Sequence, residues 1–127
     1  DAKGRKSVAD ACESPCAIER GMRILGGKWT GSILWHLKDG PVRFNDLSRM
    51  VAGASKKMIA ERLRQLEAKG LVARRVVEGG PIGVEYSITP FGATALECLD
   101  ALRLWSEKLP PEIAGLAPNS DALERHG

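Results

Sequence analysis

The sequence has few of the side chains on which catalytic and metal sites depend. It contains two histidines and three cysteines among 127 residues. Cys12 and Cys16 form one C-x3-C pair, but no second close pair follows, so a zinc site is not expected. A cysteine hydrolase needs a base, and His36 lies in a helical pattern with no third group to orient it. We therefore expect neither an enzyme nor a bound metal or cofactor.

Long apolar runs are also absent. No stretch approaches the roughly 20 apolar residues needed to cross a bilayer, so we expect no contact with a membrane. Residues 1–6 are mostly charged and no hydrophobic stretch follows them, which is not the pattern of a secretory signal. An odd number of cysteines argues against a framework of structural disulfides. The expected location is therefore the reducing cytoplasm.

Charge is distributed unevenly along the chain. Between residues 42 and 78, nine Lys or Arg stand against four Asp or Glu, whereas from 85 to 127 three bases stand against seven acids. A basic middle predicts an anionic partner for that part alone, although a charged face that is merely solvated is the alternative. The total mass of 13.7 kDa allows one domain with a modest core, so burial against a second copy is an option.

Periodicity and end signals divide the middle of the chain into helices and strands. Helices are expected over residues 18–25, 28–38, 46–50, 56–69 and 90–109. Asn45 and Ser55 are the expected N-caps of the third and fourth helices, and Thr89-Pro90 begins the fifth. Strands are expected over 42–44, 71–78 and 84–89, with a Gly/Pro-rich hairpin loop between the last two.

The expected last long helix is too apolar for one small domain. Its apolar residues fill nearly half of the helical circumference, and Leu96 and Leu104 lie outside even that arc. Such a helix predicts a second apolar partner. Trp29 and Trp105 are expected to pack in the core rather than to line a ligand pocket.

The order of these elements is typical of a winged helix-turn-helix, a mainly α fold with a small β-hairpin wing. In such a fold one helix enters the major groove of DNA, and the hairpin tip reaches the neighbouring backbone. On the 56–69 helix, Lys57 and Arg64 lie opposite the apolar side, and Glu61 shares their face although it opposes phosphate. The candidate DNA-binding residues are Ser55, Lys56, Lys57, Arg64, Arg74 and Arg75.

Five short motifs stand out along the chain, namely Ile18-Glu19-Arg20, Leu25-Gly26-Gly27-Lys28-Trp29-Thr30, Arg43-Phe44-Asn45-Asp46-Leu47, Ser55-Lys56-Lys57-Met58-Ile59 and Thr89-Pro90-Phe91-Gly92. Together they resemble the motifs of the HxlR-type bacterial transcription regulators. The resemblance implies a MarR-like winged helix, a homodimer formed by the terminal helices, and a palindromic operator in double-stranded DNA. The chain departs from the family where Pro15 precedes Cys16 instead of following it, and where Glu61 replaces a frequent Gln.

The same resemblance suggests a role for the thiols. Cys16 stands where some family members sense a small electrophile or an oxidant, and Arg20 and Arg23 follow it in the next turns, a setting that favours a thiolate. Cys12 is the candidate resolving partner, and Cys98 is expected to pack in the dimer. The alternative is that Cys16 is only a small packed residue.

We expect a loose N-terminal arm over residues 1–15 and a DNA-binding and dimerisation domain over 16–109. A C-terminal tail or short helix is expected over 110–127. The rival hypothesis is a winged-helix adaptor that binds proteins and not DNA, because a fold alone does not determine function.

Overall fold

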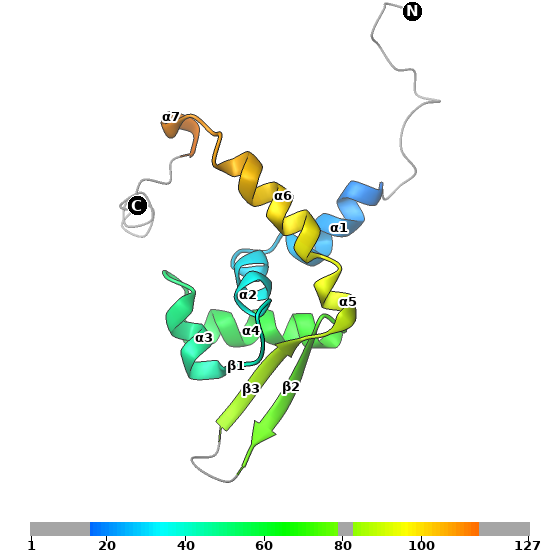
Figure 1. Cartoon of the computed structure of the whole chain (residues 1–127), viewed down its shortest axis with the longest axis vertical. Coiled ribbons are helices and arrows are strands. Elements are labelled where there is room, and N and C mark those ends of the chain that lie inside the picture. Colours follow the sequence, from blue (N-terminus) through cyan, green and yellow to red (C-terminus); the bar gives the residue numbers. More distant parts are fainter. Residues whose placement is uncertain (1–15, 79–82, 115–127) are drawn as a thin grey trace, which may run out of the picture.

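A computed structural model describes residues 16–78 and 83–114 of the chain (Figure 1). The expected arm over 1–15 with Cys12, the hairpin tip, and the end of the expected tail lie outside the described residues. The elements, in chain order, are α1 (Ala17–Leu25), α2 (Thr30–His36), β1 (Val42–Arg43), α3 (Phe44–Met50), α4 (Lys56–Ala68), β2 (Val72–Val77), β3 (Gly83–Ile88), α5 (Pro90–Ala93), α6 (Leu96–Ser106) and α7 (Pro111–Ala114).

The strands form one antiparallel sheet in the order β1-β3-β2. β2 and β3 make the expected hairpin, with Val72 opposite Ile88 and Val77 opposite Gly83. β1 pairs with the other edge of β3. A mainly helical domain with a small sheet that ends in a projecting hairpin confirms the predicted winged helix-turn-helix (Figure 1).

The core lies where α2 and α4 pack together against the sheet. α4 contributes three aliphatic side chains that are at most 1% exposed, α2 contributes two and its C-cap residue a third, and the sheet adds Val72 and Tyr86. The helical core residues are Ile33, Leu34, Leu37, Ile59, Leu63 and Leu66. The spacing of the last three along α4 explains why this amphipathic segment is a helix with one buried face.

Several helices begin or end at the capping residues that the sequence predicted. The Ser55 hydroxyl accepts a hydrogen bond from the backbone N–H of Met58 at 3.1 Å, which confirms the predicted N-cap. The Thr89 hydroxyl accepts from the N–H of Gly92 at 2.9 Å and donates to the carbonyl of Gly70 at 2.6 Å. Gly70 has φ +84°, a backbone conformation that favours glycine after a helix.

The predicted N-cap at Asn45 is wrong. α3 begins at Phe44, and Arg43 takes the extended N-cap position without a side-chain cap. The helix starts early because β1 holds Arg43 in a ladder with β3 and the chain turns directly after it. The side-chain oxygen of Asn45 accepts instead from the Lys56 ammonium at 3.4 Å.

The predicted continuous helix over 90–109 is also wrong. A turn at Thr94 and Ala95 separates α5 from α6, and α6 ends at Ser106. At the turn, these two N–H groups donate to the carbonyls three residues back, those of Phe91 and Gly92, and the Thr94 hydroxyl also donates to Phe91. These bonds tighten the backbone and end the first helix.

α6 lies across α2 through a small contact. Leu99 packs beside Gly31, where an added Cβ would be 3.1 Å from the leucine. The Arg103 guanidinium lies 5.8 Å from the centroid of the Trp35 ring. Arg103 also donates to Asp100, and this hydrogen bond raises the pKa of Arg103 above its ordinary value.

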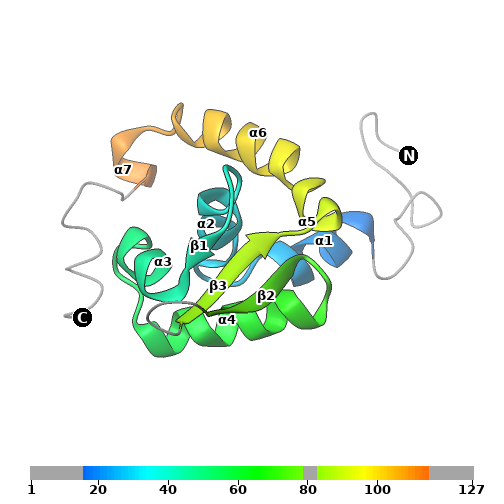
Figure 2. The same ribbon diagram turned by 60° about the horizontal axis from the view of Figure 1, so that its bottom comes forward.

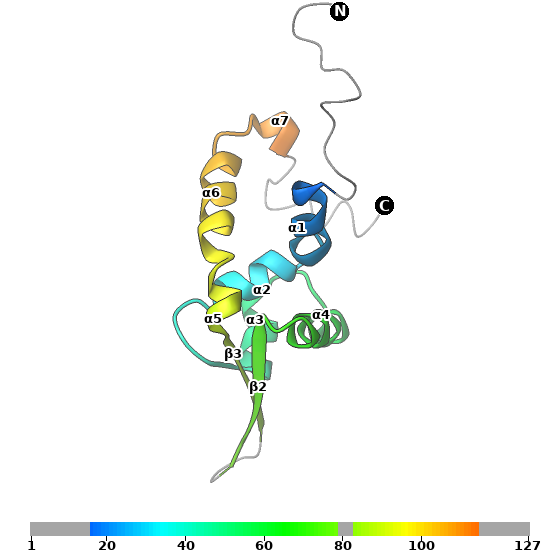
Figure 3. The same ribbon diagram turned by 90° about the vertical axis from the view of Figure 1, so that its right-hand side faces the viewer.

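The rest of α6 and the N-terminal two thirds of α1 bury little, whereas Ile24 and Leu25 at the end of α1 pack against the core. Figure 3 shows α1 and α6 at one end of the molecule, with the hairpin projecting from the other. Large apolar side chains that are about half exposed or more lie on these helices and on α7, namely Ile18, Met22, Leu102, Leu104, Trp105 and Ile113. Trp29 packs against the core as expected, but Trp105 is 58% exposed because α6 extends past the body, so its predicted core position is wrong.

Gly92 of α5 lies so close to a neighbouring backbone segment that no side chain fits there. A Cβ built there would lie 2.1 Å from the carbonyl oxygen of Leu71 and 2.9 Å from the Ile88 side chain. The Leu71 carbonyl directly precedes β2 and accepts from the N–H of Thr89 at 3.0 Å, so it cannot move away cheaply and a larger residue must push α5 outward.

We predict that Gly92→Ala destabilises the fold by at least about 1–3 kcal/mol, the usual cost of overpacking. Gly21→Ala is the control, because a Cβ at Gly21 meets nothing within 4 Å. Urea unfolding followed by circular dichroism measures both. Equal midpoints for the two variants would contradict the close approach.

Candidate nucleic-acid interface

α4 exposes a basic face opposite its buried one. Lys56, Lys57 and Arg64 are all exposed, while Ile59 and Leu63 are buried on the other side of the same helix. Figure 2 shows α4 along one edge of the body, with α2 on its inner side. Ser55, Lys56 and Lys57 stand at the N-terminal end of α4, where backbone N–H groups favour an anion.

A groove lies between α3 and the strands of the sheet. It has a volume of about 730 Å³ and is lined by Asn45 and Arg49 of α3, Arg74 of β2 and Tyr86 of β3, among others. Because Asn45 accepts from Lys56, the structure brings Lys56 and Arg74 to the borders of one groove. The Arg74 side chain makes no hydrogen bond or ion pair with the described part of the chain.

Arg75 is not brought to that groove. Neighbouring residues of a strand point to opposite faces, so Arg75 lies across the sheet from Arg74. It stands opposite Glu85 in the ladder and binds its carboxylate at 2.7 Å. Arg43 is opposite Glu85 on the other side, so a carboxylate on the central strand lies between two arginines.

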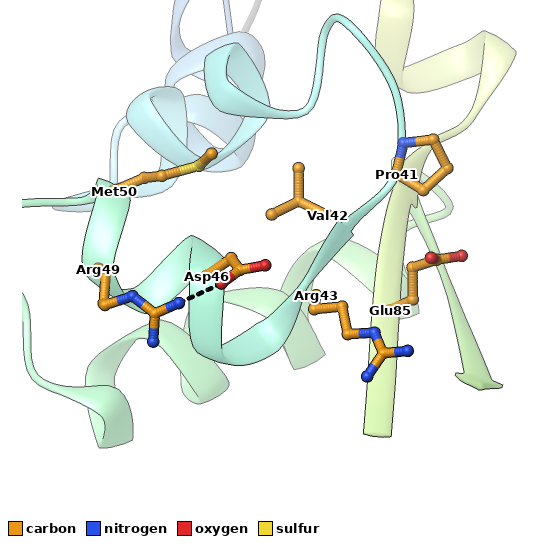
Figure 4. Close-up of a pocket in the computed structure, with 7 residues that line it drawn as sticks. All are labelled: Pro41, Val42, Arg43, Asp46, Arg49, Met50 and Glu85. Carbon is orange, nitrogen blue, oxygen red and sulfur yellow. Dashed lines mark hydrogen bonds and ion pairs between the residues drawn. The ribbon is translucent and has the colours of Figure 1, made fainter. Parts of the chain in front are cut away.

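A second hollow, of about 460 Å³, lies beside this charged row (Figure 4). Arg43 and Glu85 line it from the strands, and Asp46 and Arg49 line it from α3. Arg49 and Asp46 form an ion pair with each other. The charges around this hollow are therefore balanced, unlike those of α4.

Glu61 has a partner on its own helix. Its carboxylate binds Arg64 at 3.2 Å across one turn, and both side chains are about half exposed or more. This pairing offsets the negative charge that sequence reasoning placed on the basic face. An exposed pair of this kind is weak, so it does not lock Arg64 in place.

Sequence reasoning missed the placement of Arg62. Its Nε donates to the backbone carbonyl of Lys28 at 2.9 Å, so this arginine turns inward toward the start of α2. The signal was available: position 62 is three residues after Ile59 and four before Leu66, which puts it beside the buried side of the helix.

The thiols stand on the two exposed end helices. Cys16 is half-buried at the N-cap position of α1, and its carbonyl accepts from the N–H of Arg20. Cys98 is exposed on α6. Within residues 16–78 and 83–114, no cluster of three metal-ligating side chains occurs, and no helix is long and apolar enough to span a bilayer.

Comparison with known sequences places the chain in a family. The model of a family described as HxlR-like helix-turn-helix matches residues 24–113. The chain belongs to this HxlR-like family. The HTH-type transcriptional regulator YdeP of Bacillus subtilis (strain 168) is 38% identical over 98 residues, which are 77% of each chain. The family and these relatives are transcriptional regulators and not enzymes.

Solved structures agree with this assignment. A structure described as the redox regulator HypR in its oxidized form is 37% identical, with a TM-score of 0.69, and the match covers 75% of this chain and 98% of that one. A regulator assigned to the MarR family, from Porphyromonas gingivalis W83, is 30% identical, with a TM-score of 0.73 and coverage of 84% and 100%. The HxlR-like chain therefore has a MarR-type winged-helix fold.

Proposed function

We propose that this HxlR-like regulator is a cytoplasmic homodimer that binds a palindromic operator in double-stranded DNA and responds to an oxidant or small electrophile through Cys16. The observation that carries the DNA part is the exposed basic face of α4 beside a groove that contains Arg74. No cofactor or membrane takes part in this proposal.

In this proposal α4 enters the major groove. Lys56 and Lys57 bind phosphates beside the N-terminus of the helix, where the Ser55 cap fixes the backbone. Arg64 is about two turns further on and exchanges its Glu61 contact for a DNA phosphate. Arg74, on the hairpin wing, contacts the DNA backbone next to the major groove. Arg75 contributes less to DNA binding because Glu85 already binds it.

The partner that covers α1 and α6 is a second copy of the chain. Both helices expose large apolar side chains, including Ile18 and Trp105. A surface of this kind is costly to leave in water, and a two-fold dimer buries the same patch from both subunits. Two copies of α4 then meet two half-sites, which requires a palindrome.

The effector part rests on the position of Cys16. A thiol at the start of a helix that belongs to the subunit interface is placed so that oxidation or alkylation changes how the subunits meet. HypR, a relative in structure, is described as a redox regulator. Cys12 is the proposed resolving thiol, and it lies outside the described residues.

The rival is an adaptor that uses the same fold to bind proteins. Selection from a randomised duplex pool with reduced protein separates the two. Enrichment of a palindrome that is bound with a steep salt dependence supports the regulator, and failure to enrich any site at low salt supports the adaptor.

We predict that Lys57→Ala weakens operator binding and lowers the slope of log affinity against log salt by about 2 per dimer, since each lost phosphate contact removes about 0.9. Lys69→Ala is the matched control, with the same charge change at the far end of α4. Fluorescence anisotropy titrations at several salt concentrations measure both. An unchanged slope for Lys57→Ala means that α4 is oriented differently.

Leu102→Glu is expected to convert the dimer to a monomer. A carboxylate buried twice in a symmetric interface weakens dimerisation by roughly 100-fold or more. Met50→Glu is the control, because Met50 is similarly exposed but lies on α3, away from the end helices. Sedimentation velocity measures the oligomeric state. A dimeric Leu102→Glu variant would place the interface elsewhere.

Cys16→Ser is expected to bind the operator as tightly as the wild type and to lose the change in binding that an oxidant causes. Serine keeps the size of the side chain and removes the nucleophilic sulfur. Titration before and after treatment with a thiol oxidant, and again after a reductant, tests this. A response that persists would assign sensing to Cys12 or Cys98, or to no thiol at all.

A further inference from the structure

Arg62 is a basic residue of α4 that turns away from the exposed face. Its Nε donates to the carbonyl oxygen of Lys28 at 2.9 Å, and one Nη donates to the side-chain oxygen of Gln65 at 3.2 Å. The side chain is half-buried, whereas the neighbouring Glu61 and Arg64 are exposed. The guanidinium is thus held at two points, both within the protein.

The carbonyl that Arg62 binds belongs to the turn between α1 and α2. This turn is closely built: Trp29 has φ +76°, and the N–H of Thr30 donates to Gly27 at 3.1 Å. A Cβ added at Gly27 would lie 3.0 Å from the Thr30 hydroxyl and 3.4 Å from Nε of Arg62. The glycine thereby leaves room for the guanidinium against the backbone.

The turn is also the point from which α1 leaves the body. α1 is exposed along most of its length and packs against the core only through Ile24 and Leu25 at its C-terminal end, so the adjoining turn is what sets the direction of its exposed part. In the proposed dimer α1 contacts the partner subunit. The hydrogen bond from Arg62 therefore links α4, which is proposed to bind DNA, to the turn that follows α1, which is proposed to bind the partner subunit.

We propose that Arg62 is a positioning residue that fixes α4 relative to α1 and so sets the half-site spacing that the dimer accepts. This inference rests on the proposed DNA binding. The two half-sites of a palindrome lie about 34 Å apart, or a multiple of that, because the same groove faces the protein once per helical turn. Each added base pair also rotates one half-site relative to the other. A small change in the angle between α4 and α1 therefore alters which half-site spacing fits the dimer. Arg62 acts on the protein side of the helix and contacts no phosphate.

Two variants test the role. Arg62→Gln removes the charge, and Arg62→Lys keeps it but loses the planar fork that binds the carbonyl and Gln65 together. Binding is measured on the selected operator and on duplexes with one base pair removed or added between the half-sites, at several salt concentrations. Arg64→Gln, the proposed phosphate contact, is the matched comparison.

Both Arg62 variants are expected to bind the selected operator about tenfold more weakly and to lose most of the preference for its spacing, with an unchanged salt slope. Arg64→Gln is expected to weaken all spacings equally and to lower the slope. If Arg62→Gln behaves as Arg64→Gln does, or keeps the affinity and spacing preference of the wild type, the positioning role is wrong.

A measurement without DNA separates this inference from the proposed function. Hydrogen exchange in the turn around Lys28 and Trp29 is expected to be about tenfold faster in both Arg62 variants, with α4 itself still protected. Unchanged exchange in the turn overturns the positioning role, whether or not the wild type binds a duplex. Wild-type protein that binds no duplex overturns the DNA-binding proposal, and with it the part of this inference that concerns spacing.

Discussion

The packing of Ile59, Leu63 and Leu66 against α2 is the interaction on which the other features of the molecule depend. It fixes the rotation of α4 about its own axis, and that rotation decides which side chains face outward. Truncation of one such residue to alanine typically costs about 2–5 kcal/mol, a large part of the stability of a small domain. The basic face of α4 is therefore a product of the core as much as of its own lysines.

Elements set by local chemistry were predictable from the sequence. Ser55 and Thr89 cap helices because their hydroxyls accept from N–H groups three residues on, and Gly70 ends a helix because it adopts a positive φ. Asn45 is an equally good capping residue, yet β-ladder pairing at Arg43 overrides it. The break at Thr94 could not be predicted from the sequence, because no glycine or proline marks it and Gly92, two residues before it, lies against Leu71, far away in the sequence.

The candidate DNA-binding site also combines features that the sequence predicts with features that only the fold determines. That Lys56, Lys57 and Arg64 are exposed follows from the helical period alone. The directions of long side chains on or beside that face depend on neighbours far away in sequence: Arg62 bends toward Lys28, 34 positions before it. Arg74 and Arg75 look equivalent in the sequence, but the hairpin register places only Arg75 opposite Glu85. A count back from the loop would have found this pair.

The separation of charge between the two ends of the domain has a kinetic consequence. The end with α1, α6 and α7 carries five carboxylates against four Lys or Arg and is nearly neutral, while the excess of lysines and arginines of α4 and the hairpin lies toward the opposite end (Figure 3). Such an arrangement is an electric dipole along the molecule, and an external field exerts a torque on it. A polyanion approached by diffusion would rotate the protein before contact, so that a larger share of collisions begins with α4 facing the polyanion. In the proposed dimer the end helices of two copies meet with little net charge, so apolar contact supplies most of the attraction.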